Sequence, residues 1–150
     1  MGTGAMTGGV ATIVNASGVA TLNRHLNADS YPLTAVYSGD PISGPSASPT
    51  LIQVVQQTSS SAALTSSLNP STRGQAVTLT ATISSPTVRP TGPVTFTVGK
   101  TVLGTAELSN GKAKLTISTL AVGSSKVTAT FNGDLNVTGS SASVTQTVQQ

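Results

Sequence analysis

Internal repetition constrains the fold of this 150-residue chain more than any other feature of the sequence. Three segments from its first third recur near its C-terminus, at almost constant spacing. The pairs are GVATL (18–22) with GKAKL (111–115), LTAVYSGD (33–40) with VTATFNGD (127–134), and LIQVVQQ (51–57) with VTQTVQQ (144–150). The last pair defines a complete copy of the repeat, which runs from Thr58 to Gln150.

The first copy is predicted to be partial. TGGVATIV (7–14) aligns with TGPVTFTV (91–98) at a smaller offset than the other pairs, which predicts a deletion of about nine residues in the region matching 100–108. Residues 61–83, the opening strands of the complete copy, have no counterpart. We therefore expect two domains: a partial repeat at residues 1–57 and a complete one at 58–150.

Apolar and polar residues alternate along the complete copy, a pattern typical of half-buried β-strands. The inward positions are predicted to be Val77, Leu79, Ala81, Ile83, Val94, Phe96, Val98, Ala113, Leu115, Ile117, Val127, Ala129 and Phe131. Turn residues separate these strands, and Asn110-Gly111 predicts a two-residue hairpin because both residues tolerate positive φ. No helical period of useful length is present. About seven short strands indicate an all-β, immunoglobulin-like β-sandwich.

The series NPSTRGQAVTLTATI (69–83), TGPVTFTVGKTVLGTAELSNGKAKLTISTLAVGSSKVTATFNGD (91–134) and SASVTQTV (141–148) resembles the bacterial immunoglobulin-like repeats that occur in tandem in large surface proteins. The resemblance covers most of residues 58–150 and part of 7–57. It implies a stalk, spacer or adhesion module outside the cell or on its surface. It carries over no catalytic residue, because the fold hosts many roles.

Composition excludes several classes of function. Only 7% of residues are charged and the net charge is +3, with cations scattered singly rather than in the basic stripe that nucleic-acid binding needs. There is no Cys, so disulfides and thiolate chemistry are excluded. No apolar stretch is long enough to span a bilayer. The first 14 residues lack the basic region of a secretion signal, so any such signal is expected outside this sequence.

No catalytic constellation is predicted, and we expect a protein that is not an enzyme and needs no cofactor. His25 is the only histidine, and it lies with Asp29 in a polar segment where a solvated side chain is the simpler interpretation of a His-Asp pair. The four acids, Asp29, Asp40, Glu107 and Asp134, fall on separate turns and strands rather than in the pair that glycosidases use.

Calcium is the best of the ligand hypotheses, although we expect no metal. Asp40 and Asp134 with Asn136 lie in SGD and NGDLN turns, but such residues also form turns without metal. An isopeptide crosslink involving Glu107 with Lys112 or Lys114 is disfavoured, because both lysines alternate outward. Asn15 and Asn136 fit the glycosylation sequon, which arises often by chance in a chain so rich in Ser and Thr.

The partial copy has no opening strands to cover its apolar strand faces, which are formed by Val10, Thr12 and Val14, by Ala20 and Leu22, and by Leu33, Ala35 and Tyr37. Three outcomes are open: packing against the complete domain, poor order, or acceptance of a strand from another chain. Intermolecular completion through residues 7–57 is favoured because Gln57-Thr58 leaves little linker. Two functions follow: a structural or adhesive surface module with an unidentified ligand, or a self-assembling filament subunit.

Overall fold

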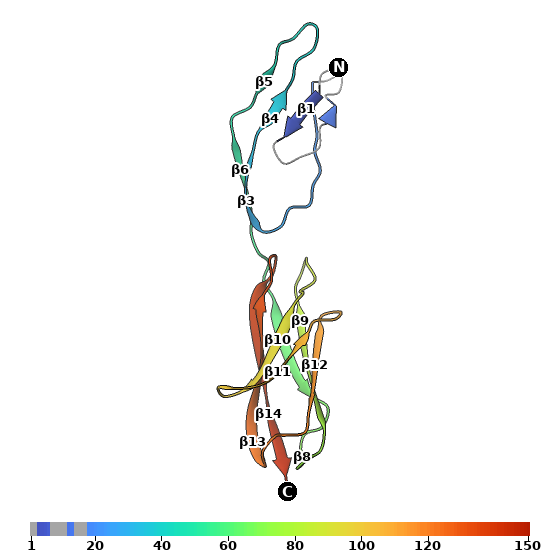
Figure 1. Cartoon of the computed structure of the whole chain (residues 1–150), viewed down its shortest axis with the longest axis vertical. Helices are drawn as coiled ribbons and strands as arrows, with labels where there is room; N and C mark the ends of the chain where they lie inside the picture. The colour runs from blue at the N-terminus through green and yellow to red at the C-terminus, as the bar shows by residue number, and fades with distance from the viewer. Residues whose placement is uncertain (1–2, 7–11, 14–17) are drawn as a thin grey trace. The chain divides into compact units, whose positions relative to one another are not determined.

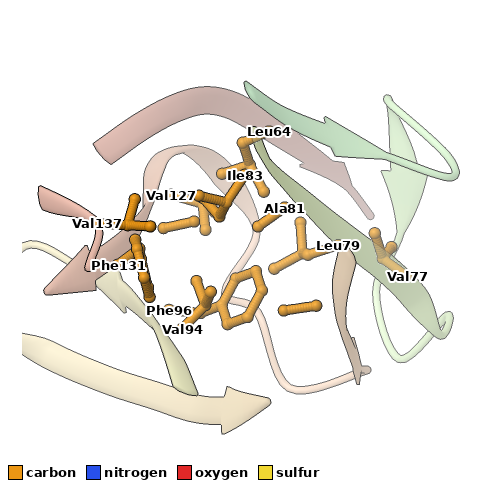
Figure 2. Close-up of a cluster of buried hydrophobic side chains, with 12 residues drawn as sticks. Leu64, Val77, Leu79, Ala81, Ile83, Val94, Phe96, Val127, Phe131 and Val137 are labelled. Carbon is orange, nitrogen blue, oxygen red and sulfur yellow. The ribbon is translucent and has the colours of Figure 1, made fainter. Parts of the chain in front are cut away.

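The alternating strands of residues 58–150 form two sheets that enclose a core (Figures 1 and 2). A computed structural model of the chain describes residues 3–6, 12–13 and 18–150, with side chains from residue 18 onward. The chain divides into two units, Met1–Gln56 (the first unit) and Gln57–Gln150 (the second unit). Each unit is described below by itself.

The second unit is an all-β sandwich of the immunoglobulin-like class, as predicted. Its five-stranded sheet has the order β11-β10-β13-β14-β8, and its three-stranded sheet has the order β12-β9-β7. The strands are β7 (Ser61–Ser66), β8 (Ser71–Thr72), β9 (Val77–Ser84), β10 (Pro93–Val98), β11 (Thr101–Glu107), β12 (Lys112–Ile117), β13 (Gly123–Gly133) and β14 (Thr138–Gln149). Every pairing is antiparallel except that of β14 with β8.

The core lies between these sheets, and β9 is its central wall. All four inward residues of β9 are at most 2% exposed, as are the inward residues of β10 and β13 that they face. Figure 2 shows the side chains of Leu79 and Ala81 pointing toward Phe96. The chain has no Trp, so Phe96 and Phe131 are the largest buried side chains, as the sequence predicts. The inward positions of β9, β10 and β13 are confirmed, with Val98 only partly buried.

The two-residue turn predicted at Asn110-Gly111 is confirmed, but the predicted hairpin is wrong, because the turn joins strands of different sheets. Asn110 has φ 51° and Gly111 has φ 74°, and Ser109 and Lys112 exchange both backbone hydrogen bonds around them. The ladder stops at this pair. The preceding strand β11 belongs to the five-stranded sheet, and β12 belongs to the three-stranded one.

The first unit contains two small sheets in its described part. One has the order β2-β1-β4-β5, and the other pairs β3 with β6. The strands are β1 (Thr3–Met6), β2 (Thr12–Ile13), β3 (Asp29–Leu33), β4 (Ala35–Tyr37), β5 (Ser46–Ala47) and β6 (Leu51–Val55).

These strands reproduce the register of the β13–β14 hairpin. Asp29 pairs with Val55 and Leu33 with Leu51, as Gly123 pairs with Val148 and Val127 with Val144. Strand β4 lies against β1 as β13 lies against β10, with Tyr37 in the place of Phe131. The first unit is therefore built as the closing half of the same sandwich, with its long hairpin divided into the pieces β3–β6 and β4–β5.

Two details of the first copy differ from the sequence alignment. Thr12 and Ile13 pair with β1 at the position where the end of β11 pairs with β10, so β1 rather than residues 7–14 takes the place of β10. Most of 7–14, including Val10 and Val14, lies outside the described residues. Residues 18–22 form no strand. Their counterpart β12 pairs with β9, and the described part of the first unit contains no equivalent of β9.

The missing wall leaves the first unit without a core in the part that the structure describes. None of residues 18–56 is buried. Leu51 is 63% exposed, whereas its counterpart Val144 is packed against the core. Ala35 is exposed, whereas its counterpart Ala129 is 0% exposed. The same strand register is therefore present in both units, but only the second buries it.

A buried glutamine attaches β14 to the loop between β7 and β8. The Gln146 side chain is 0% exposed. Its Oε1 accepts a hydrogen bond from Ser66 Oγ at 2.6 Å, and its Nε2 donates to Leu68 O at 2.9 Å and, more weakly, to Ser71 Oγ at 3.3 Å. Asn69 completes the attachment, since its Nδ2 donates to Thr145 O and its Oδ1 accepts from Thr147 N.

Replacing Gln146 by Met tests this attachment. Met keeps the volume but removes the hydrogen bonds that the Leu68 carbonyl and the Ser66 hydroxyl make with Gln146, leaving them only the 3.2 Å hydrogen bond to each other. The free energy of unfolding should therefore fall by about 1–3 kcal/mol. Urea unfolding of the second unit measures it. Gln149→Met, on the exposed end of the same strand, is the matched control and should change stability by less than about 0.5 kcal/mol. Equal effects of the two substitutions would contradict the role given to Gln146.

Candidate functional site

The two turns considered as calcium sites, at Asp40 and Asp134, have the same hydrogen-bond geometry in both units. In the first unit, Asp40 Oδ1 accepts hydrogen bonds from the backbone N–H of Ile42 at 2.9 Å and of Ser43 at 2.7 Å. In the second unit, Asp134 Oδ1 accepts from Asn136 N and Val137 N, each at 2.9 Å. Each aspartate is thus the acceptor of an Asx-type turn that its own carboxylate closes.

The glycine before each aspartate is required by the turn. Gly39 has φ 87° and Gly133 has φ 92°, a conformation that residues with a side chain rarely adopt. A Cβ on Gly39 would lie 2.8 Å from Ser43 O, and one on Gly133 would lie 2.7 Å from Val137 O. The Gly-Asp pair therefore encodes a tight turn in both copies.

The second carboxylate oxygen differs between the two turns. Asp134 Oδ2 accepts from the backbone N–H of Thr91 at 2.8 Å and from its Oγ1 at 3.0 Å, which fastens the segment before β10 to the turn. Desolvation raises the pKa of Asp134, but hydrogen bonds from Asn136, Thr91 and Val137 together outweigh it and lower that pKa below 3.8.

In the first unit, Asp40 Oδ2 instead accepts from Tyr37 Oη at 2.8 Å. The backbone hydrogen bond from Ile42, with those from Tyr37 and Ser43, lowers the pKa of Asp40. The same hydrogen bond to Asp40 raises the pKa of Tyr37.

These contacts give both carboxylates a structural use. All four carboxylate oxygens of Asp40 and Asp134 accept N–H or O–H donors, whereas Ca²⁺ needs oxygens that are free to coordinate it. Within the described residues, no three His, Cys, Asp or Glu side chains gather as a metal site would require. These carboxylates therefore hold the turns in place through hydrogen bonds.

The other candidate residues lie apart on the surface. His25 and Asp29 are exposed, and Asp29 Oδ1 accepts a hydrogen bond from the adjacent Ser30 N. Lys112 and Lys114 are exposed on either side of the buried Ala113, as their alternation predicts. The sequon residue Asn15 is outside the described residues, and Asn136 is half-buried in the Asp134 turn. Across the described part of the chain, no helix has the length and apolar character needed to cross a membrane.

The first unit exposes apolar side chains on the sheet face that corresponds to the core face of the second unit. We call it the open face, and it consists of Leu33, Ala35, Tyr37, Leu51, Gln53 and Val55. None of these residues is buried. Five of their counterparts, Val127, Ala129, Phe131, Gln146 and Val148, are at most 4% exposed, and the sixth, Val144, is partly buried against the core. An open hollow of about 340 Å³ lies between Ala20, Tyr37 and Ala47.

The opposite side of β6 is also apolar. Ile52 and Val54 are each 56% exposed, and the second unit carries Thr145 and Thr147 at the equivalent positions. Strand β6 therefore exposes apolar side chains on both faces. Exposed apolar patches of this kind mark interaction surfaces in soluble proteins.

Sequence reasoning missed the glutamines of the open face and of the core. Gln53 and Gln146 occupy the same place in LIQVVQQ (51–57) and VTQTVQQ (144–150). The signal was a polar residue at an inward position of an alternating strand in both copies. The residue type does not indicate burial by itself, because a glutamine in a strand is usually solvated.

Acid titration tests the role of Asp134. Its pKa is lower in the folded chain than in the unfolded one, so its contribution to stability is present above pH 3.8 and is lost as pH falls through the lower folded pKa. Asp134→Asn should lower the melting temperature of the second unit at pH 7 and flatten its decline below pH 4. Asp29→Asn is the control and should leave both unchanged. An unaltered acid profile in Asp134→Asn would contradict this role.

Comparisons with known proteins agree with this architecture. A family model described as the bacterial Ig-like domain (group 3) matches residues 64–149. A solved structure of the fibronectin(III)-like modules of CbhA from Clostridium thermocellum is similar, with a TM-score of 0.53 and 19% sequence identity. That match covers 82% of this chain and 64% of the other, and it bears on the fold alone. No curated protein matches the chain.

The sandwich of two sheets and the family match over more than half of the sequence lead to one conclusion. The chain belongs to the bacterial Ig-like domain family, group 3.

Proposed function

We propose that this chain is a non-catalytic structural module, a spacer or adhesion unit, of a bacterial cell-surface or secreted protein. The observation that carries the proposal is the path of the chain through the second unit. Thr58 enters beside Val137, at one end of the β13–β14 hairpin, and Gln149 leaves beside Thr72, at the other end (Figure 1).

Entry and exit at opposite ends suit a module that works in series with others. Strand β14 has 12 residues and runs from one end to the other, so each such module adds about 40 Å to a tandem array. The entry is fixed by hydrogen bonds from Thr58 N to Asn136 O and from Gln57 Nε2 to Asp134 O. The exit is fixed by β8, which pairs in parallel with the end of β14.

The family and the surface support the same proposal. Ig-like and fibronectin III-like domains are generally non-catalytic and typically extracellular or surface-associated. The 7% of charged residues leaves a surface dominated by neutral side chains, and loops such as the Asp134 turn are where sandwich modules bind their ligands. Leu135 in that turn is 60% exposed and Ile42 in the Asp40 turn is 96% exposed, so both turns present an apolar side chain for an adhesive contact.

Surface exposure of the module tests the proposal. Antibodies raised against residues 58–150 should label intact cells of the source bacterium or recover the protein from its culture medium. Protease treatment of intact cells should remove the cell-bound signal, while a cytoplasmic marker protein stays intact as the control. Labelling that needs permeabilised cells, with none in the medium, would contradict the proposal.

A second candidate function is assembly, in which the first unit is completed by a strand from a neighbouring polypeptide and the products form filaments. The observation that favours it is the open face together with the exposed Ile52 and Val54 on the other side of β6. Short strands without a covering layer bury too little apolar surface to be stable alone, and uncovered sheet edges recruit other strands.

Sedimentation velocity tests assembly. The full chain should sediment faster than its monomer at tens of micromolar, because open faces that have no opening segment to cover them pair with one another. Residues 58–150, which contain their own core, should remain monomeric. Ile52→Thr with Val54→Thr gives the first unit the residues of the second and should reduce association if the outer side takes part. A full chain that stays monomeric throughout would contradict self-association.

A further inference from the structure

We propose that the open face is an acceptor for an additional opening segment of this repeat, a polypeptide with the strand–loop–strand pattern of residues 58–84, and that Gln53 is a specificity-determining residue for it. The inference rests on the assembly function and deepens it, because it names the occupant. The chain itself contains the template, since the second unit shows the equivalent face when it is occupied.

The template fixes how the occupant lies. In the second unit, β9 covers β10 and β13 with Leu79, Ala81 and Ile83, all at most 2% exposed. The first unit keeps the register of the covered hairpin, with Leu33 on Leu51 as Val127 is on Val144. An equivalent of β9 laid over the open face would therefore meet Leu33, Ala35 and Tyr37 at the positions of Val127, Ala129 and Phe131.

The edge of β6 also corresponds to the edge of β14 that binds an opening segment in the second unit. In the second unit, the last residues of β14 pair on their outer edge with Ser71 and Thr72 of β8. In the described part of the first unit, β6 pairs with β3 on one edge and with no strand on the other. The backbone of Val55 and Gln56 is the counterpart of the segment that binds β8, so it is in place to bind the same part of an opening segment.

Gln53 favours an occupant that offers hydrogen-bonding groups over one that is only apolar. Its counterpart Gln146 holds the loop between β7 and β8 through Ser66 Oγ and Leu68 O, at 2.6 Å and 2.9 Å. Gln53 is exposed, and its Nε2 donates to the neighbouring Val54 O at 3.0 Å. An apolar partner would leave this amide buried without partners, at a cost in free energy, whereas an opening segment offers it a hydroxyl and a carbonyl.

Exchange of opening segments among intact copies does not complete the first unit. Residues 1–150 hold two closing halves and one opening segment, so any exchange among copies of these residues leaves one face per copy uncovered. Donation would also withdraw Leu79, Ala81 and Ile83 from the core of the donor. The occupant is therefore an opening segment beyond the one in residues 58–150, and pairing of two open faces from two copies is the competing arrangement.

The probe is a synthetic peptide of residues 58–84, titrated into the full chain by calorimetry. We expect one peptide bound per chain and slower amide exchange in residues 29–55, with no change in the second unit. Gln53→Ala should weaken binding about tenfold, the loss expected for two hydrogen bonds at a buried amide. Gln56→Ala is the matched control on the same segment and should change affinity less than twofold. A peptide with Leu79→Ser should bind at least tenfold more weakly.

A tethered version keeps the proposal testable if the free peptide is insoluble. Residues 58–84 joined by a flexible linker ahead of Met1 should protect residues 29–55, and Gln53→Ala should reduce that protection. Absence of protection with both the peptide and the tether would overturn the proposal. If the chain nevertheless self-associates, assembly stands and the occupant is a second copy. If it neither binds nor associates, the assembly function fails as well.

Discussion

The packing of β9 across β10 and β13 is the contact on which the rest of the structure depends. Burial of apolar side chains is the main favourable term in folding, and a single sheet with an apolar face cannot supply it alone. In the second unit, Leu79, Ala81 and Ile83 fill one side of the core, and Phe96 and Phe131 fill the other. The turns, the buried glutamine and the strand register all position these two layers.

Comparing the two units shows which features depend on nearby residues and which depend on a distant segment. The Gly-Asp turn, with its positive-φ glycine and its two backbone N–H donors, is the same at Asp40 and at Asp134. The hairpin register is also shared. What differs is the covering sheet, and with it the burial of most inward residues. Short-range signals therefore specify the strands, while a segment far away in sequence determines whether they form a core.

The sequence predicted the fold of the second unit well because its signals are local. Alternation identified the inward residues of β9, β10 and β13, and Asn110-Gly111 identified a turn. The sequence did not show that this turn joins two different sheets. That depends on where the chain leaves the five-stranded sheet, at Leu108 and Ser109. In the first copy, alignment assigned residues 18–22 to a strand. The alternation of residues 18–22 fits a strand. A strand there would pair with an equivalent of β9, and the segment's own sequence does not reveal whether that equivalent is present.

The candidate site was predictable only in part. The Asp40 and Asp134 turns were identified, whereas the hydrogen bonds from Thr91 to Asp134 Oδ2 depend on a tertiary contact that the turn sequence does not encode. The uncovered face was expected from the absent opening strands. The role of Gln146, and hence of Gln53, became visible only when its hydrogen bonds to a loop nearly 80 residues away were seen.

Amide hydrogen exchange on the full chain tests the central claim most directly, that the first unit is a closing half without its cover. The account predicts slow exchange throughout β9, β10 and β13, at rates set by global unfolding of the second unit. It predicts exchange at least 100-fold faster in β3, β4 and β6 at a dilution where the chain is monomeric. Equal protection of the two sets of strands in the isolated monomer would contradict it.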